Sequence, residues 1–496
     1  MRRLLTKNVA LVGVFAALHV ILYFMSFGLW RNWAIYLEPI EGIVFSNIKG
    51  LHSYFHIRVS LNEIRADVER VDLLSAFDAE SVIRHIWEVA PSGGVICDAG
   101  VLKTRLSDIP TLPLPFWDEY WKKLEEKDIK PETVGDLLKE AEKNNVRVYP
   151  VPYMDLLRDV AQKIGEEKLS RLTRMLNVLA LGVSFGLVGY DKTFVGRAIG
   201  AIFRGKQKII DMNLLALDIA YDYTIRNFGS FDFKLETVQT NEKRMFLQGT
   251  QAVALGKLVG GCRIQTYYPI TPAADESEYL EDNERLETLF MQGEGSIIVM
   301  QTEDEIAAIN MASGAALAGA RAATSTSGPG FSLMVEGLGW AGNNEVPVVI
   351  TYYQRGAPGT GMPTRHGQAD LRFVIHAAHG EFPRIVLCSG DMEECFYDAA
   401  LVFNYADRYQ IPVIHLIDKG LANSNKSYKM FDLNRVKIER GQLLSERGIE
   451  DGEYRRFKST ESGIDEKGRV TDETTRRLIR ELLENLVAWT RRIGKE

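Results

Sequence analysis

The chain has 496 residues, of which 46% are apolar and 25% are charged, and its formal net charge is −7 at pH 7. This length predicts two to four domains, and the composition is typical of folded globular proteins rather than disordered chains. The acidic balance provides no basic surface for nucleic acid, so the sequence indicates no nucleic-acid partner.

The first 43 residues differ in character from the rest of the chain. Residues 9–30 contain no charged side chain, lie between basic residues, and are long enough to span a bilayer. Two interpretations stay open. The segment is either foreign to the domains behind it, as in a recombined gene, or a membrane anchor. Contact with a membrane is possible only through residues 9–30.

The globular pattern begins at position 44 and forms a first domain over residues 44–234. Strands are predicted at residues 94–97 and 146–150. An amphipathic helix is predicted over residues 155–175. Residues 175–190 are uncharged but too few to cross a membrane, so they predict a buried helix.

A polar linker at residues 235–243 leads to a second domain over residues 244–423. Strand-like and helix-like segments alternate there, which predicts an α/β fold with a mostly parallel sheet and helices on both faces. The expected elements are a strand at 296–300, a helix at 306–320, a helix at 331–340, and strands at 348–353 and 414–418.

Polar turns lie at the ends of these expected strands. They are Tyr268-Pro-Ile-Thr-Pro272, Gln301-Thr-Glu-Asp-Glu305, Ser327-Gly-Pro-Gly330 and Gln354-Arg355. In open α/β sheets, ligands bind beyond the carboxyl ends of the strands. The sequence therefore predicts a binding site at this edge of the sheet.

Residues 424–496 form a charged C-terminal extension. Residues 471–493 predict one amphipathic helix, whose apolar stripe requires a partner in this chain or another.

The four cysteines are scattered, at Cys97, Cys262, Cys388 and Cys395. No two have the C-x-x-C spacing of zinc or iron–sulfur sites, so we predict no metal site in this chain. Cysteines without such a framework fit the reducing cytoplasm, and we expect all four to be buried apolar side chains.

The motifs in the second domain resemble those of one enzyme family. Tyr268-Pro-Ile-Thr-Pro272, Thr326-Ser-Gly-Pro-Gly-Phe331 and the segment from Gly361 to Leu371 are similar to the alpha subunit of the 2-oxoacid:ferredoxin oxidoreductases. These enzymes use thiamine diphosphate to decarboxylate a 2-oxoacid oxidatively. They pass two electrons to ferredoxin and the acyl group to coenzyme A.

The resemblance implies the architecture of the whole chain. Residues 44–234 resemble the gamma domain that archaeal members often fuse in front of alpha, and residues 244–423 resemble a pyrimidine-binding domain. Lys49, His52 and Ser53 match gamma-domain residues near a coenzyme A site, with an ordinary solvated loop as the alternative.

The resemblance also implies a partner. The chain lacks the Gly-Asp-Gly motif, followed by asparagine, that holds magnesium and diphosphate in this family. We therefore expect thiamine diphosphate to be shared with a beta subunit. That subunit would carry the magnesium and an iron–sulfur cluster.

Glu305 is expected, by resemblance, to be the catalytic carboxylate that hydrogen-bonds the aminopyrimidine ring of the cofactor. Burial and the helix N-terminus would both act on its charge. Glu303 is the alternative, and helix capping is the competing role for either glutamate.

Thr271 and Arg355 are expected, by resemblance, to bind the substrate, because a guanidinium can bind a carboxylate through two parallel hydrogen bonds. A surface ion pair is the competing role for Arg355. The residues expected to line the cofactor are Tyr268, Pro269, Ile270, Pro272, Ser327, Gly328 and Gly330. Thr364, Arg365 and Gln368 are given lining roles only.

Three functions remain open from the sequence. The leading one is a gamma–alpha subunit of a 2-oxoacid:ferredoxin oxidoreductase, with pyruvate and 2-oxoglutarate among its possible substrates. Another is a non-catalytic remnant subunit, and the third is a membrane-tethered binding protein that depends on residues 9–30.

Overall fold

The computed structural model divides the chain into two compact units, Met1–Ile438 and Glu439–Glu496. The residues it describes are 36–39, 55–59, 70–109, 112, 114–229, 231–235, 244–286, 295–360, 363, 365–442, and positions 473, 476, 477, 480, 481 and 484. Residues 9–30 and the predicted site residues Lys49, His52, Ser53 and Thr364 lie outside this set. Within it, no helix is both long and apolar enough to cross a membrane.

The first part of the chain contains a small parallel sheet in the order β3-β4-β5. Its strands are β3 (Val71–Ala76), β4 (Val89–Asp98) and β5 (Arg147–Val151). Helices of this region are α2 (Ala79–His85), α3 (Leu114–Glu126) and α4 (Val134–Lys143). Strands β4 and β5 contain the predicted strands at 94–97 and 146–150.

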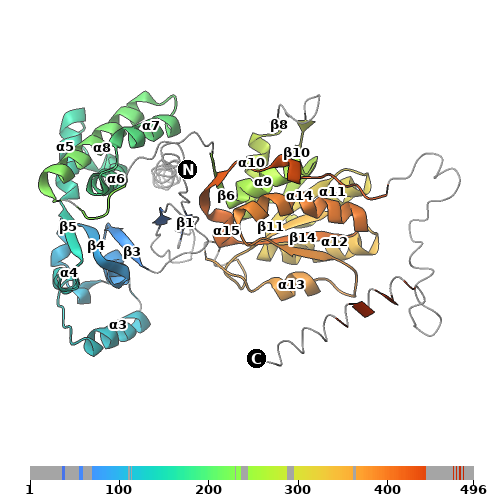
Figure 1. The fold of residues 1–496 in the computed structure, drawn as a ribbon, viewed down its shortest axis with the longest axis horizontal. Helices are drawn as coiled ribbons and strands as arrows, with labels where there is room; N and C mark the ends of the chain where they lie inside the picture. The colour runs from blue at the N-terminus through green and yellow to red at the C-terminus, as the bar shows by residue number, and fades with distance from the viewer. Residues whose placement is uncertain are drawn as a thin grey trace. The chain divides into compact units, whose positions relative to one another are not determined.

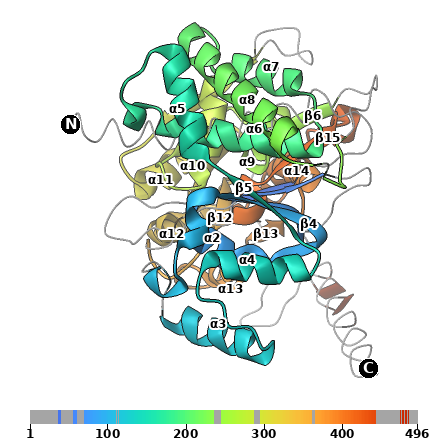
Figure 2. The ribbon, with the colours of Figure 1, turned by 90° about the vertical axis from the view of Figure 1, so that its left-hand side faces the viewer.

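A group of four helices follows, visible together in the upper part of Figure 2. They are α5 (Tyr153–Ile164), α6 (Leu176–Val188), α7 (Lys192–Ile202) and α8 (Gln207–Asn227). The predicted buried helix is confirmed, because most of α6 is inaccessible to solvent. The predicted helix over 155–175 is wrong in extent. It ends at Ile164 because Gly165 takes the left-handed conformation (φ 72°), and two short 3-10 turns follow.

The second sheet has six parallel strands in the order β10-β7-β11-β12-β14-β13. Three of them, β10, β11 and β14, are labelled in Figure 1. They are β7 (Ile264–Tyr267), β10 (Ile298–Gln301), β11 (Ala322–Ser327), β12 (Val349–Gln354), β13 (Ile385–Cys388) and β14 (Val413–Asp418). This confirms the predicted α/β fold class.

Helices cover both faces of this sheet. Their bounds are α9 (Gly249–Val259), α10 (Ala273–Asp282), α11 (Glu305–Leu317), α12 (Gly328–Asn343), α13 (Leu371–His376), α14 (Met392–Tyr409) and α15 (Lys419–Asn423). Alternate residues of β12 point to opposite faces. Ile350 and Tyr352 pack with α11, α12 and α13, whereas Val349 and Tyr353 pack with α9, α10 and α14.

Shorter strands complete the described fold. A four-stranded sheet has the order β2-β1-β15-β6, and β8 pairs with β9. Their bounds are β1 (Tyr36–Pro39), β2 (Phe55–Arg58), β6 (Arg244–Gln248), β8 (Arg285–Leu286), β9 (Gly295–Ser296) and β15 (Asn425–Lys429).

Three cysteines are buried, as expected, but Cys388 is exposed. That expectation was wrong for Cys388 because it is the last residue of β13, the strand at the edge of the sheet. In the C-terminal unit the six described positions are helical, charged and exposed, which fits the polar face of the predicted helix. The residues of its apolar stripe lie outside the described set.

Candidate functional site

The carboxyl ends of five parallel strands meet at one edge of the large sheet. The turn after β7 carries Thr271, α11 begins with Glu305 after β10, and β11 runs directly into α12 at Gly328. Arg355 follows β12, and Lys419 follows β14. Parallel strands therefore bring together segments that are far apart in the sequence, as the predicted edge site requires.

Thr271 and Arg355 are in direct contact. The Arg355 guanidinium donates from Nη1 to the Thr271 carbonyl oxygen at 2.6 Å. Arg355 is only 5% exposed, and its Nε has no hydrogen-bond partner among the described residues. Burial lowers the pKa of Arg355, since a desolvated cation is disfavoured. The surface ion pair proposed as its competing role does not occur among the described residues.

Glu305 is 5% exposed and is the first residue of α11, whereas Glu303 is exposed. Desolvation raises the pKa of Glu305, and the neighbouring charge of Asp304 adds to this effect. A carboxyl group with a raised pKa can share a proton with a ring nitrogen more readily than an exposed one can. Burial therefore favours Glu305 over Glu303 for the predicted catalytic role.

Helix α11 is capped by Asp304, and not by either glutamate. The Asp304 side chain accepts a hydrogen bond from the Ala307 amide at 2.7 Å. Aspartate is a preferred N-cap residue, so the sequence alone could have indicated Asp304 as the cap of this helix. Capping by Asp304 leaves the Glu305 carboxylate available for other contacts.

Gly330 makes room for that carboxylate. A Cβ atom at position 330 would collide with Glu305 Oε1 and with Thr326 Oγ1. The glycine in the first turn of α12 is thus required by the close approach of Glu305. This contact places the Ser327–Gly330 turn, which the sequence predicted to line the cofactor, directly against the predicted catalytic residue.

The other predicted lining residues lie around the same edge. Tyr268 is 38% exposed, Pro269 is exposed, Ile270 is half-buried and Pro272 is buried. The Ser327 hydroxyl donates to the Tyr353 carbonyl at 2.8 Å, so its side chain holds neighbouring strands together. Gln368 donates from Nε2 to Asp418 Oδ2 at 3.2 Å, and the Arg365 carbonyl accepts from the Gly356 amide.

Sequence reasoning missed Tyr352 and Asp370. The Tyr352 hydroxyl donates to Asp370 Oδ2 at 2.9 Å, and a Cβ at Gly328 would lie 3.2 Å from that hydroxyl oxygen. The Asp370 amide donates to Gln354 Oε1 at 3.1 Å. These bonds fix the segment after Arg365 against the end of β12.

Sequence reasoning also missed Lys419 and Asp275. Lys419 is 3% exposed, and burial lowers its pKa to about 8, with Asp275 opposing the shift and Arg355 adding to it. Asp275 lies in the first turn of α10. Although its side chain is exposed, surrounding protein desolvates the carboxylate and raises its pKa to about 6, with help from Glu278.

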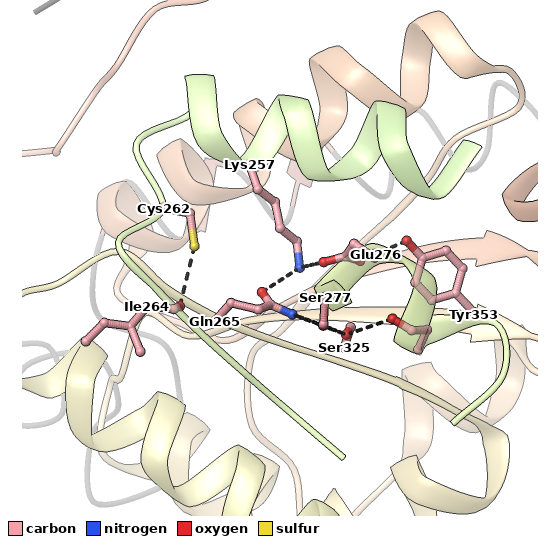
Figure 3. A network of polar contacts seen from close by, with 9 residues as sticks. Lys257, Cys262, Ile264, Gln265, Glu276, Ser277, Ser325 and Tyr353 are labelled. Carbon is pink, nitrogen blue, oxygen red and sulfur yellow. Dashed lines mark hydrogen bonds and ion pairs between the residues drawn. The ribbon is translucent and has the colours of Figure 1, made fainter. Parts of the chain in front are cut away.

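A buried polar network holds α10 on the sheet behind these turns (Figure 3). Lys257 forms an ion pair with Glu276 and donates to Gln265 Oε1 at 3.1 Å. The Tyr353 hydroxyl donates to Glu276 Oε2 at 2.8 Å, which ties α10 to β12. The remaining members are Ser277 and Ser325, whose hydroxyl oxygens are 2.8 Å apart.

The described residues fit half of a thiamine diphosphate site. Glu305 presents a buried carboxylate at the start of α11, which fits an aminopyrimidine ring that hydrogen-bonds a carboxylate. No group of three or more histidine, cysteine, aspartate or glutamate side chains in the described part of the chain could hold a metal ion.

Comparisons with known proteins identify the family of the chain. Residues 256–476 match the family described as "Pyruvate flavodoxin/ferredoxin oxidoreductase, thiamine diP-bdg", and residues 43–223 match "Pyruvate ferredoxin/flavodoxin oxidoreductase". The solved 2-oxoglutarate:ferredoxin oxidoreductase from Magnetococcus marinus, with 2-oxoglutarate, coenzyme A and succinyl-CoA bound, is 24% identical with a TM-score of 0.68. The match covers 94% of this chain and 74% of that chain, and it shows a shared fold.

Two relatives carry the family assignment. The chain is 45% identical over 430 residues to 2-oxoacid:ferredoxin oxidoreductase 1, subunit alpha, of Sulfurisphaera tokodaii, which covers 85% of this chain and 66% of the relative. It is 40% identical over 438 residues to 2-oxoacid:ferredoxin oxidoreductase 2, subunit alpha, of Aeropyrum pernix, which covers 86% of this chain and 67% of the relative. The chain thus spans about two thirds of the length of these relatives. It belongs to the family of 2-oxoacid:ferredoxin oxidoreductase alpha subunits.

Proposed function

We propose that this chain is the alpha subunit, with a fused gamma-type domain, of a 2-oxoacid:ferredoxin oxidoreductase. With a beta subunit it would decarboxylate a 2-oxoacid oxidatively, pass the electrons to ferredoxin and form the acyl thioester of coenzyme A. The observation that carries the proposal is the contact between Thr271 and Arg355 at the same sheet edge as the buried Glu305. The match of residues 43–223 supports a gamma-type domain over residues 44–234.

Each residue has a specific part in this reaction. Arg355 binds the carboxylate next to the keto group, and the Thr271 hydroxyl, which makes no hydrogen bond with the described residues, donates to that carboxylate or to the keto oxygen. Glu305 holds a proton at the aminopyrimidine ring nitrogen. When bound, thiamine diphosphate supplies the nucleophilic carbon that attacks the substrate. The residues that line the cofactor are proposed to be those of the two turns 268–272 and 327–330.

A beta partner is needed for the other half of the cofactor site. We propose that it holds the magnesium, the diphosphate and an iron–sulfur cluster, and that ferredoxin accepts the electrons from the complex. Relatives are named as alpha subunits, which supports such an assembly. The cytoplasm remains our prediction for its location.

The face formed by α11, α12 and α13 fits such a partner. It exposes large apolar side chains, namely Ile306, Met311, Leu317, Leu333, Trp340, Leu371 and Ile375. A groove of about 680 Å³ lies beside α13, lined by residues that include Val335, Phe373 and His376. Large apolar side chains gathered on one exposed face are typical of a subunit interface. The face also begins at Glu305, where the aminopyrimidine ring of the shared cofactor would lie.

The docking surface is testable by substitution. Leu333→Glu should prevent co-purification of the beta subunit without changing the unfolding midpoint of the chain alone. Tyr409→Glu is the matched control, because Tyr409 is exposed to a similar extent on α14, which covers the opposite face of the sheet. Equal co-purification with both variants would place the interface elsewhere.

The function itself is tested by co-expression of this chain with its neighbouring gene. Reduction of ferredoxin would be measured with coenzyme A and a panel of 2-oxoacids. We expect turnover by the complex and none by the isolated chain. Turnover by the chain alone would contradict the partner requirement. A stable complex that turns over no 2-oxoacid would instead support the non-catalytic alternative.

A further inference from the structure

Two cations leave the sheet side by side at the proposed substrate site. Gln354 of β12 and Asp418 of β14 are paired in register, so the residues after them, Arg355 and Lys419, start from neighbouring positions. Neighbouring strands are about 4.8 Å apart. Both side chains therefore begin about one strand spacing from each other.

Both cations are buried and poorly paired. Lys419 is 3% exposed and makes no hydrogen bond or ion pair with any described residue. Arg355 makes its hydrogen bond to the Thr271 carbonyl, but its buried Nε has no partner in the described set. Removing a charge from water without a partner costs several kcal/mol. Such a cost is offset where a bound anion supplies the missing partner.

The nearby acidic charge does not neutralise both cations. Asp275 attracts Lys419, while Arg355 repels it. Asp275 is itself desolvated and is repelled by Glu278, so its own ionised form is disfavoured. Asp275 can therefore balance at most one of the two buried cations, which leaves positive charge at the site for an anionic ligand.

We propose that Lys419 binds the second carboxylate of a short dicarboxylic 2-oxoacid while Arg355 binds the carboxylate beside the keto group. This inference rests on the proposed function. A dicarboxylic 2-oxoacid has one carboxylate for each of the two cations, which start from neighbouring strands. A monocarboxylic 2-oxoacid, in contrast, has no group to pair with Lys419.

The test uses the full chain in complex with its beta subunit. The value of kcat/KM for 2-oxoglutarate relative to pyruvate would be measured for wild type, Lys419→Met and Lys419→Arg. We expect Lys419→Met to lower this ratio about 10- to 100-fold, as the loss of a hydrogen bond to a charged group predicts. Lys419→Arg, which keeps the charge, should recover part of it. Lys437→Met removes an exposed lysine and is the matched control.

A binding measurement separates this inference from the proposed function. Glutarate and butyrate lack the keto group and cannot react, so their effect on the thermal unfolding of the complex reports binding alone. Wild type should be stabilised more by glutarate than by butyrate, and Lys419→Met should lose this difference.

Each result decides one of the two proposals. Equal losses for both substrates would place Lys419 at the shared carboxylate and overturn the inference, as would an unchanged ratio. If no 2-oxoacid were turned over while glutarate still stabilised the complex through Lys419, the dicarboxylate site would stand and the proposed reaction would fail.

Discussion

Two buried lysines in the same sheet domain have opposite surroundings. Lys257 is 0% exposed, pairs with Glu276 and donates to Gln265. Lys419 is nearly as buried but has no such partner among the described residues. A closed network whose charges pair with one another stabilises the fold. A buried charge without a partner at a strand end costs stability and is better explained by the binding of a ligand of opposite charge.

This difference separates the two regions of the domain. Around Lys257, every member contacts another on a different element, so α9, α10 and the strands are held in one arrangement (Figure 3). At the carboxyl edge, Glu305, Arg355 and Lys419 are also buried, but Arg355 Nε and the Lys419 ammonium have no hydrogen-bond partner among the described residues. Substitutions in the first region should change stability, and those at the carboxyl edge should change binding and catalysis.

The largest effect is expected for Glu305→Gln. This change keeps the shape of the side chain but removes its ability to exchange a proton, which typically costs about 100- to 10,000-fold in rate. Turnover by the complex would measure the loss, and urea unfolding of the chain should be nearly unchanged. Glu303→Gln, at an exposed position, is the control. A rate within a few-fold of wild type would move the catalytic role away from Glu305.

Lys257→Met should break the closed network. It leaves Glu276 buried without its cation, and the loss of one partner of a buried pair costs about 3–5 kcal/mol. The free energy of unfolding in urea measures this loss. Replacing both residues, with Lys257→Met and Glu276→Leu together, should recover part of it because no charge is then stranded. A single variant as stable as wild type would show that the network does not hold the domain together.

Lys419→Met should stabilise the protein below pH 8, in contrast to the destabilising Lys257→Met. Burial lowers the pKa of Lys419 from 10.5 to about 8, with Asp275 and Arg355 as its charged neighbours. Between these pH values the unfolded chain binds more protons, so the stability of wild type rises as pH increases from about 8 to 10.5. Below pH 8, Lys419→Met should therefore be more stable by up to about 3 kcal/mol, at about 1.4 kcal/mol per pH unit.

The check is the pH dependence of the difference between the two proteins. The advantage of Lys419→Met should shrink above pH 8 and vanish near pH 10.5, whereas Lys437→Met should differ little from wild type throughout. A Lys419→Met variant that is less stable at pH 7 would mean that Lys419 has a partner in the ligand-free protein.

Much of the open site was predictable from local sequence. Strand-like runs that end in Tyr268–Pro272, Ser327–Gly330 or Gln354–Arg355 place polar groups at a sheet edge whatever the strand order. Glu305 was expected from family resemblance, and its burial distinguishes it from Glu303. Thr271 and Arg355 were expected, from family resemblance, to bind the same substrate. The structure brings Arg355 Nη1 within 2.6 Å of the Thr271 carbonyl oxygen.

The closed network and the additional cation could not be predicted in this way. Lysine is rarely fully buried, so a lysine on a helix such as α9 predicts a solvated position. Lys257 is buried only because strand order brings Gln265 and Glu276 to it. Lys419 is likewise adjacent to Arg355 through the register of β12 and β14, and sequence alone does not set register between distant strands.

The smallest effect is expected for Arg355, and it tests the division of labour between the two cations. Arg355→Met should raise KM for pyruvate and for 2-oxoglutarate by similar factors, roughly tenfold or more, because both substrates share the carboxylate beside the keto group. Arg355→Lys keeps the charge but loses the two parallel donors, so we expect a smaller increase. Measuring KM for pyruvate and for 2-oxoglutarate in both variants shows whether Arg355 binds the shared carboxylate. If only 2-oxoglutarate is affected, Arg355 contacts the far carboxylate and the assignments of Arg355 and Lys419 must be exchanged.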